Sequence, residues 1–523
     1  MTTEAVKRGW LDTLKAYRHP RVVTMLFLGF SAGLPILLIF STLSLWLREA
    51  DVSRATVTYF SWAALGYSFK FIWAPIVDKM PLPVLDVLMG RRRSWLLIAQ
   101  LAVIVAILWM GFVDPSVNLT AMAFAAVMLG FSSATQDIVI DAYRIESASA
   151  DLQALLSSTY IAGYRIGMLV AGAGGLKLAA HWGSETEYIY SAWKWTYICM
   201  AGTMSIGIIT TLLISEPDIK RQPNRYLSSL RDYLRFLVLF ALVVAAFVCV
   251  FFFSSDVVKS LKTVLVDDYA LNTGLAGFLV ETLRMAFALL IAYAVSRISV
   301  NLGVASKQLL QETYIEPLAN FFSRYGKPAL LILALVGIYR VSDIVLGVIS
   351  NVFYKDLGFS KDQIANIVKF FGLWMTILGG FLGGGLAFRY GVLRILFIGG
   401  VLAAATNILF MFLAQMGNNE WMLILVISAD NLSAGLASAA FVAYLSSLTD
   451  IRFTALQYAL FSSIMTLFPK LLAGYSGGIV DSIGYESFFL FTAILGVPVL
   501  VLIYYIGRIV PIDETAVAES EGK

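Results

Sequence analysis

Two aspartates stand four residues apart in the stretch 136–144, QDIVIDAYR, inside an otherwise apolar segment. In a helix this spacing places Asp137 and Asp141 on one face, and Arg144 follows on that face three residues later. Two carboxylates in poorly hydrated surroundings resist ionising together, so one of them is expected to bind and release a proton. The pattern predicts proton coupling at both aspartates. The alternative is that Asp141 and Arg144 form a gate salt bridge while Asp137 pairs with a partner such as Arg165.

Charged residues also interrupt the other apolar segments. A charge in the middle of a membrane costs about 2.5–3.5 kcal/mol, so each of these residues is expected to face a cavity or a partner. The set comprises Lys70, Asp137, Asp141, Arg165, Lys177, Glu281, Arg284, Arg340, Asp343, Lys369, Asp430 and Lys470.

Part of this set can line a polar cavity between two halves of the protein. Several cations and amides suit an anionic, hydroxyl-rich substrate, and Tyr164 offers a surface for stacking a sugar or peptide, unless it only packs inside the protein. Arg340 and Asp343 can instead neutralise each other. Glu281 and Arg284 are expected to pair with each other and to be structural. The predicted substrate-binding residues from this argument are Lys70, Tyr164, Arg165, Arg340, Asp343, Lys369, Asp430 and Asn431.

The composition indicates that lipid surrounds the elements carrying these charges. Hydrophobic residues make up 59% of the 523-residue chain and charged residues 14%, whereas soluble domains carry about a quarter charged residues. A hydrocarbon core about 30 Å thick needs about 20 apolar residues in a helix. We predict fourteen spans, near 23–47, 57–77, 94–113, 120–142, 154–179, 193–214, 236–255, 274–296, 328–352, 363–387, 393–414, 421–446, 455–480 and 486–507.

The distribution of basic residues predicts the orientation of these spans. Segments on the same side as the N-terminus hold 24 Lys and Arg residues, and the opposite loops hold 7. Basic residues concentrate on the cytoplasmic side of membrane proteins, so both termini are expected to be cytoplasmic. The basic stretch 1–22 precedes an apolar run that is too long for a signal peptide, and we expect an uncleaved first span.

The spans divide into six, two and six, which predicts an N-terminal bundle (1–214), an inserted pair with a cytoplasmic amphipathic stretch (215–327) and a C-terminal bundle (328–523). The stretch 74–79, APIVDK, and the following GRRR at 90–93 match 383–391, GGGLAFRYG, in the second half. Both copies resemble the loop motif of the major facilitator superfamily, although Phe388 replaces the acidic residue of the second copy. We expect the gate residues to be Asp78, Arg91, Arg92, Arg144 and Arg389.

Glycine-rich segments occur late in each half, AGAGG at 171–175 and GYSGG at 474–478. Glycines at such spacing allow helices in lipid to approach closely. We therefore expect a close helix contact at each segment, unless these glycines serve only generic packing.

Several longer motifs resemble the AmpG-type muropeptide permeases. They are FLGFSAGLP at 27–35, STLSLW at 41–46, FKFIWAP at 69–75, GRRRSW at 90–95, SATQDIVIDA at 133–142, GYRIGMLV at 163–170 and TALQYAL at 454–460. The resemblance covers both six-helix halves and is weakest across 215–327. It adds Gln136 and Gln457 to the candidate substrate-binding residues.

The resemblance implies an all-α integral membrane protein of the bacterial inner membrane, with the major facilitator fold and 14 transmembrane helices. It implies proton-driven import of N-acetylglucosaminyl-1,6-anhydro-N-acetylmuramyl (peptides) from periplasm to cytoplasm, which feeds cell-wall recycling and β-lactamase induction. Related permeases carry siderophores or acetyl-CoA, and their cationic cavities leave those substrates open. A membrane-embedded enzyme or channel is a further alternative, but paired gate loops favour alternating access.

The sequence gives no support for catalysis, a cofactor or a metal site. It lacks a phosphate-binding P-loop, a nucleophile elbow and an HExxH helix. The two cysteines, Cys199 and Cys249, lie in apolar runs, so no disulfide or thiolate metal site is expected. The run Arg91–Arg93 is better explained by topology than by nucleic-acid binding. We expect a monomer with the substrate, protons and the lipid bilayer as its partners.

Overall fold

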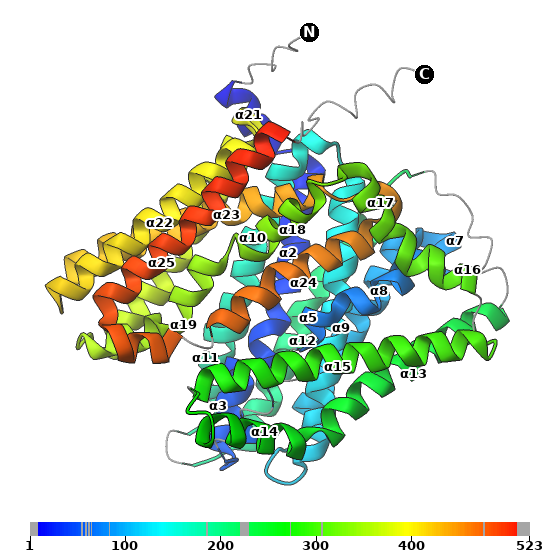
Figure 1. Ribbon diagram of the computed structural model, residues 1–523, viewed down its shortest axis with the longest axis horizontal. Coiled ribbons are helices and arrows are strands. Elements are labelled where there is room, and N and C mark those ends of the chain that lie inside the picture. Colours follow the sequence, from blue (N-terminus) through cyan, green and yellow to red (C-terminus); the bar gives the residue numbers. More distant parts are fainter. Residues whose placement is uncertain are drawn as a thin grey trace.

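The structure is a computed structural model in which the described residues are 9–53, 56–57, 60, 63, 65–82, 84–184, 187–219, 230–271, 273–304, 307–473 and 476–509. Every regular element in this part of the chain is a helix, which confirms the all-α prediction (Figure 1). The apolar composition is therefore organised as a set of long helices packed side by side. Together they form a multi-pass membrane protein.

The first half of the bundle contains the helices between residues 20 and 213. They are α2 (Pro20–Ile39), α3 (Ser41–Glu49), α5 (Leu65–Phe69), η2 (Lys70–Ile72), α6 (Ala74–Lys79), α8 (Arg91–Gly111), α9 (Leu119–Ser147), α10 (Gln153–Leu169), η4 (Val170–Gly174), α11 (Gly175–Trp182) and α12 (Tyr190–Leu213).

The second half contains the helices between residues 329 and 509. They are α18 (Ala329–Ile338), α19 (Val341–Asp356), η6 (Ile364–Phe371), α21 (Gly372–Tyr390), α22 (Val392–Met416), α23 (Glu420–Ser447), η7 (Ile451–Phe453), α24 (Thr454–Ala473) and α25 (Ser476–Ile509). The division of the chain into three domains stays a prediction.

Fourteen membrane spans are not confirmed. Eleven helices in the described residues are long and apolar enough to cross a membrane, or twelve if the bent pair α13 (Leu230–Phe253) and α14 (Ser255–Asp267) counts as one span. The predicted span 57–77 coincides with short segments, α5, η2 and α6, together with residues outside the described part. The predicted span 455–480 begins as α24, whose polar residues Gln457 and Lys470 reduce its hydropathy.

The first described helix, α1 (Trp10–Tyr17), and the last turns of α25 lie at one end of the molecule, which we call the terminal end; the other is the opposite end (Figure 1). Helix α1 packs against α21 there, and the loop that joins α23 to α24 lies at the same end. This end is where the two halves make their polar contacts, as described below.

Glycines bring two helix pairs into direct backbone contact. A Cβ atom on Gly29 of α2 would lie 2.1 Å from the Tyr160 carbonyl oxygen of α10, and one on Gly163 would lie 1.9 Å from the Leu26 carbonyl oxygen. In the second half, a Cβ on Gly379 of α21 would lie 2.0 Å from the Leu432 carbonyl oxygen of α23. No larger residue fits at these crossings, so the halves are built on tightly packed helix pairs.

The predicted close contact at the second glycine-rich segment is wrong for the residues described there. A Cβ on Gly477 or Gly478 would meet nothing within 4 Å, whereas one on Gly172 in the first segment would meet the Leu37 side chain at 2.8 Å. Gly474 lies outside the described residues. The close approach in the second half occurs instead between α21 and α23.

Several spans are interrupted near their middle. The helix of the first span breaks at Phe40, and a 3-10 turn begins at Lys70. The predicted span 328–352 is divided into α18 and α19 at Tyr339 and Arg340, and η6 forms a π-helix. Irregular backbone at membrane depth occurs where it is buried in protein or lines a cavity, so these breaks point to the molecule's interior pathway.

The inserted helices pack on the outside of the first half. Phe247 of α13 lies 5.3 Å from Phe69 of α5, measured between ring centroids, and α15 (Thr273–Asn301) runs beside α13 (Figure 1). The predicted pairing of Glu281 and Arg284 is confirmed, with a distance of 3.3 Å between carboxylate and guanidinium. Lys262 of α14 also binds the Glu281 carboxylate, at 2.9 Å.

Candidate transport pathway and its closed end

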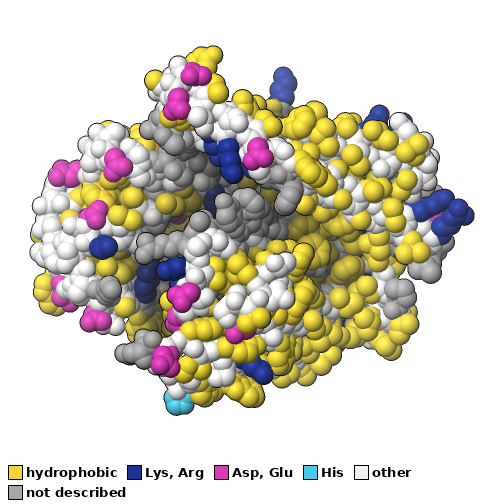
Figure 2. Space-filling view, turned by 90° about the horizontal axis from the view of Figure 1, so that it is seen from below, with side chains coloured by type: hydrophobic (Ala, Val, Ile, Leu, Met, Phe, Trp, Pro, Cys, Tyr) yellow, Lys and Arg dark blue, Asp and Glu magenta, His cyan; other side chains and the backbone are white. Residues whose placement is uncertain are grey.

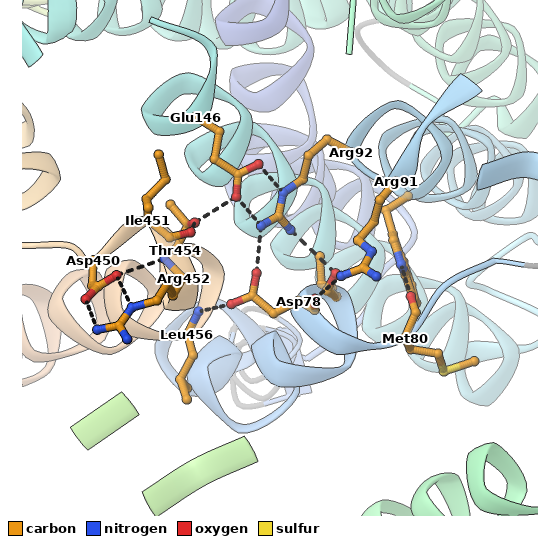
Figure 3. Close-up of polar contacts among 12 residues, drawn as sticks. Asp78, Met80, Arg91, Arg92, Glu146, Asp450, Ile451, Arg452, Thr454 and Leu456 are labelled. Atoms are coloured by element: carbon orange, nitrogen blue, oxygen red, sulfur yellow. Dashed lines mark hydrogen bonds and ion pairs between the residues drawn. The ribbon is translucent and has the colours of Figure 1, made fainter. Parts of the chain in front are cut away.

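A buried arginine organises the contact between the halves at the terminal end (Figure 3). Arg92, at the start of α8, is 1% exposed and donates to Asp78 at 2.6 Å and to Glu146 at 2.9 Å. Glu146 accepts a hydrogen bond from the Thr454 hydroxyl at 2.7 Å, and Asp78 accepts one from the Leu456 backbone N–H at 3.2 Å. Two carboxylates of the first half therefore bind both Arg92 and the start of α24 in the second half.

A second buried arginine also joins the two halves at the terminal end. Arg144 of α9 donates to Ser157 at 2.9 Å and to Ser446 of α23 at 2.7 Å. Its guanidinium also lies over the Tyr458 ring of α24, 5.0 Å from the ring centroid. The side chain is fully buried, so these contacts replace its hydration. Arg144 thus has the position expected of a gate residue.

The hydrogen bonds and other polar contacts between the halves lie at one end of the described molecule. We call the residues that make them the seam: Asp78, Arg92, Arg144 and Glu146 with Ser446, Thr454, Leu456 and Tyr458. Among the described residues, no hydrogen bond or ion pair joins the two halves at the opposite end. The face seen from below in the orientation of Figure 1 is hollowed near its middle, with Lys and Arg side chains in and beside the hollow (Figure 2).

The predicted proton-coupling aspartates lie in a buried polar cluster of the first half. Asp141 accepts from Lys70 at 3.4 Å and from Arg144 at 3.2 Å, and all three side chains are buried. Asp137 is also buried, and its Oδ1 atom accepts no hydrogen bond within the described part of the chain. Lys70 and Asp141 are the charged groups that face it most closely. The two aspartates are therefore unequal, because Asp141 has two cationic partners and Asp137 has none in direct contact.

Two arginines from different halves interact electrostatically inside the bundle. Arg165 of α10 and Arg340, at the break between α18 and α19, are both half-buried, and the positive charge of Arg340 acts on Arg165. Asp343 faces both Arg340 and Asp430 of α23, yet the described residues contain no ion pair between Arg340 and Asp343. The side chains of Arg165, Arg340 and Asp343 make no hydrogen bond to any described residue. This arrangement suits a ligand that carries its own charges.

Asp430, Lys369 and Tyr164 each have partners of their own. Asp430 accepts from the Thr406 hydroxyl at 3.4 Å. Lys369, on the exposed side of η6, donates to Asn351 of α19 at 2.8 Å. The Tyr164 ring lies 6.0 Å from that of Tyr160.

Three predicted substrate-binding residues form hydrogen bonds to neighbouring helices, and their substrate role stays a prediction. Gln136 is fully buried and donates to Ser31 of α2 at 3.4 Å. Asn431 accepts from Thr376 of α21 at 2.9 Å. Gln457 lies at the terminal end. There its amide donates to the Pro317 carbonyl at 2.8 Å in α17 (Glu316–Tyr325), and its carbonyl accepts from the Asp450 N–H at 2.7 Å.

The two gate-loop copies differ in their contacts. Arg91 donates to the Asp78 carbonyl oxygen at 2.6 Å, beside the Arg92 network. Arg389 of the second copy lies over the rings of Trp10 and Tyr390, at 5.0 and 5.1 Å from their centroids. Since Phe388 takes the place of an acidic residue there, the second loop contacts the N-terminal helix α1 rather than a carboxylate.

The sequence argument missed Glu146 and Thr454. The signal for Glu146 was a carboxylate two residues after Arg144, at the end of a span and opposite a run of three arginines. A buried Arg92 needs more than one acceptor, so a second carboxylate was to be expected near Asp78. Thr454 stands in a motif that had already been singled out, but only its structural position assigns it to the seam.

The loop between α23 and α24 is fixed by an ion pair outside the membrane-spanning segments. Burial raises the pKa of Asp450, but hydrogen bonds from the Arg452 side chain and backbone outweigh it and hold this pKa below its ordinary value. The shortest side-chain contact of the pair is 2.9 Å.

No group of His, Cys, Asp and Glu able to hold a metal ion occurs among the described residues.

Comparison with known proteins identifies a matching family and several similar proteins. The model of the Major Facilitator Superfamily matches residues 25–310 and 331–522. A protein of Rickettsia felis named "Putative transporter AmpG 4" is 29% identical over 94% of this chain and 98% of its own. The "Anhydromuropeptide permease" of Escherichia coli is 28% identical over 94% of this chain and 80% of its own.

Solved structures of low sequence identity share the fold. The transporter FucP, described in the outward conformation, has a TM-score of 0.59 at 10% identity and covers 94% of this chain and 99% of its own. The proton:xylose symporter XylE has a TM-score of 0.55 at 13% identity, with 95% of each chain covered. Both are membrane transporters, in agreement with the arrangement of two halves around a central pathway.

Proposed function

The chain belongs to the major facilitator superfamily, and we propose that it is a proton-driven importer of N-acetylglucosaminyl-1,6-anhydro-N-acetylmuramyl (peptides) in a bacterial inner membrane. Its transport function follows from the family. The choice of substrate rests on the relatives with 28–29% identity and on the charges inside the bundle. Import of these products would supply cell-wall recycling and induce β-lactamase expression.

The facing pair Arg165 and Arg340 is the observation that carries the choice of an anionic substrate. Like charges inside a membrane protein are costly unless an anion lies between them. Arg165 lies on a helix of the first half, and Arg340 lies at the break in a helix of the second half. One substrate carboxylate bound to both arginines would therefore contact both halves at once. Asp343 and Asp430 would accept hydrogen bonds from the substrate's hydroxyl, amide or amino groups.

We assign the transported proton to Asp137. Its buried Oδ1 atom accepts no hydrogen bond from the described residues, whereas Lys70 and Arg144 already compensate Asp141. Protonation removes an uncompensated buried charge and leaves Lys70 bound to Asp141. Release of the proton would draw Lys70 from Asp141 towards Asp137.

This exchange of partners connects the proton to the seam. Asp141 accepts from Arg144, and Arg144 in turn holds Ser446 and Tyr458 of the second half. A change in the Lys70–Asp141 contact therefore changes the charge balance at Arg144. We propose that the protonated state favours the outward-facing arrangement that loads substrate, with the terminal end closed. Proton release to the cytoplasm then resets the cycle.

The direction of transport depends on the terminal end being cytoplasmic. Its support is the excess of Lys and Arg residues, 24 against 7, on that side of the predicted spans. A reporter fused after Lys523 should be active only in the cytoplasm, and one inserted within 256–273 only in the periplasm. A periplasmic C-terminus would contradict both the orientation and the assigned direction.

The test of the function is uptake of labelled anhydro-disaccharide by proteoliposomes, with and without an inward proton gradient. We expect accumulation with the gradient, equilibration without it, and counterflow when the vesicles are preloaded with unlabelled substrate. Unlabelled anhydromuropeptide should compete, whereas a siderophore or acetyl-CoA should not. Uptake without counterflow would indicate a channel. Competition by a siderophore but not by anhydromuropeptide would indicate that the protein transports a siderophore.

A further inference from the structure

The N-terminal helix α1 crosses from the first half to the second at the terminal end. It precedes α2 by two residues, yet it packs along the last turns of α21. The guanidinium of Arg389, next to the last residue of α21, lies over the Trp10 ring. Because α21 is a candidate membrane span, a helix beside its final turns lies at the depth of the membrane surface.

The inner face of α1 fits a recess between the halves. The Tyr17 hydroxyl donates to the Phe381 carbonyl of α21 at 2.5 Å and lies 3.2 Å from the Ser158 hydroxyl of α10. Thr13, one turn earlier, is 2% exposed. A Cβ on Gly384 would lie 2.4 Å from the Ser158 oxygen and 2.8 Å from the Tyr17 oxygen, so the recess exists only because glycine stands there.

Tyr17 therefore contacts one helix from each half, at the point where α10 meets α21. Burial raises the pKa of the Tyr17 phenol to about 12, so the hydroxyl keeps its proton and remains a donor. Any movement that separates α10 from α21 at this end must break the contact to Phe381 or to Ser158. The inner face of α1 thus opposes opening of the terminal end.

The outer face of α1 combines apolar and basic side chains. Leu11 is 72% exposed and Leu14 is 62% exposed, and Lys15 and Arg18 are exposed on the same side of the helix. The acidic residue of the helix, Asp12, is bound to the Gly9 backbone N–H at 2.9 Å. Exposed leucines flanked by cations at the membrane surface match the chemistry of an anionic phospholipid layer.

We propose that α1 is a membrane-surface latch, whose outer face binds anionic phospholipid headgroups while Tyr17 and Trp10 on its inner face hold the terminal end closed. Binding of Lys15 and Arg18 to the lipid surface keeps α1 against α21 and so favours the state in which the seam is formed. The proposal concerns lipid and the closed end. It does not depend on which substrate is transported.

The lipid contact can be measured with a fluorophore on α1. In a Cys199→Ser/Cys249→Ser background, Leu14→Cys is labelled, and quenching by brominated acyl chains is compared between phosphatidylcholine vesicles and vesicles that also contain phosphatidylglycerol. We expect stronger quenching with phosphatidylglycerol, and Lys15→Gln/Arg18→Gln should reduce it to the level in phosphatidylcholine. Arg508→Gln, an exposed cation on α25 at the same end, should leave quenching unchanged.

The latch can be measured through a residue buried between the halves. Ala154→Cys, 2% exposed at the start of α10 in the same background, should react with a maleimide in nanodiscs only when the terminal end opens. Tyr17→Phe should raise its labelling rate by about fivefold, the size expected for the loss of one hydrogen bond. Trp10→Leu should also raise the labelling rate, because it removes the contact between Arg389 and the Trp10 ring, which does not involve Tyr17.

The dependence of the labelling rate on lipid charge distinguishes a lipid-bound latch from a helix that only stabilises the fold. Lys15→Gln/Arg18→Gln should raise Ala154→Cys labelling in nanodiscs with phosphatidylglycerol and not in those with phosphatidylcholine alone. The proposal is overturned if the parent protein labels equally fast in both lipids, or if neither Tyr17→Phe nor Trp10→Leu changes the rate. Cross-linking of Leu14→Cys between two copies without lipid quenching would assign the outer face to a second copy instead.

Discussion

Arginines at the terminal end of the bundle and arginines in its interior differ in how they are bound. At the terminal end Arg92 and Arg144 are almost completely buried, and each has acceptors in direct contact, including groups that lead into the second half. In the interior of the bundle, the half-buried Arg165 and Arg340 come from different halves and bind no described residue. The same side-chain type therefore closes the terminal end and, in the interior, is left available for a ligand.

This difference explains why the halves meet where they do. A buried arginine is stable only when acceptors satisfy its N–H groups, and at the seam the protein supplies these acceptors itself. Between Arg165 and Arg340, we propose that the substrate supplies them. Substrate binding would then give the second region the kind of contact that the first already has. Under our proposal that the terminal end is cytoplasmic, the formed seam corresponds to an outward-facing state.

The largest effect is expected from removing the central cation of the seam. Arg92→Met leaves Asp78 and Glu146 buried without their common partner, at a cost of about 3–5 kcal/mol. The closed end should open, which maleimide labelling of Ala154→Cys in the Cys199→Ser/Cys249→Ser background would detect as a large rate increase. Arg452→Met, which removes a largely exposed side chain, should change labelling little because ion pairs with an exposed partner contribute about 0–1 kcal/mol. Equal labelling rates in the Arg92→Met and Arg452→Met variants would contradict a central role of Arg92 in closing the terminal end.

A smaller effect on binding is expected from the unpaired arginines. Arg165→Gln and Arg340→Gln should each weaken binding of the anhydro-disaccharide by about 10- to 100-fold, because a hydrogen bond to a charged group contributes about 1.5–3 kcal/mol. Both variants should label at Ala154→Cys like the parent in the absence of substrate. Binding by isothermal titration in detergent measures the loss. Unchanged affinity in both would mean that the substrate's anionic group binds elsewhere.

The loop that leads into α24 should contribute less still. Asp450→Asn removes a carboxylate whose pKa is below its ordinary value, at a cost of about 0.5–1 kcal/mol in thermal stability. The contribution of this group is fully present above the ordinary pKa of Asp, and it is lost as the pH falls through the lowered value in the folded protein. Melting curves of parent and variant should therefore converge in strongly acidic buffer. A constant difference at all pH values would contradict an electrostatic origin.

The smallest effect on transport is expected from the inserted helices. Glu281→Gln combined with Arg284→Met removes a partly exposed cluster on the outside of the first half, away from the seam. Uptake should remain close to that of the parent. A well-expressed double variant without transport would show that α14 and α15 contribute to the pathway.

Local spacing predicted the contacts that lie within one continuous helix. The pairs Asp141–Arg144 and Glu281–Arg284 are both three residues apart, and both ion pairs form. Arg340 and Asp343 have the same spacing but no ion pair, because the helix ends at Ile338 and resumes at Val341. A single sequence gives no sign of such a break, since Tyr339 and Arg340 are ordinary helix residues.

Contacts between distant helices could not be read from spacing. Lys70 and Asp141 are 71 residues apart, and Glu146 and Thr454 are 308 apart. The loop motif did indicate Asp78 and Arg92 as gate residues, because an acidic residue near an arginine run is a recognisable pattern. Gln457 was placed with the substrate because its motif resembles a family, whereas its amide is bound to the linker helix α17.

The central claim is that Asp137 carries the proton while Asp141 belongs to the ion-paired chain that leads to the seam. The direct test is Asp137→Asn in proteoliposomes, with gradient-driven accumulation and exchange of labelled for unlabelled substrate measured side by side. About 2.3 kcal/mol per charge per 100 mV is available to drive accumulation, and a neutral amide cannot use it. We predict that accumulation is abolished and exchange is retained, since exchange needs no net proton movement. Accumulation equal to that of the parent would contradict the proton assignment, and loss of both activities in a folded protein would move it to Asp343 or Asp430.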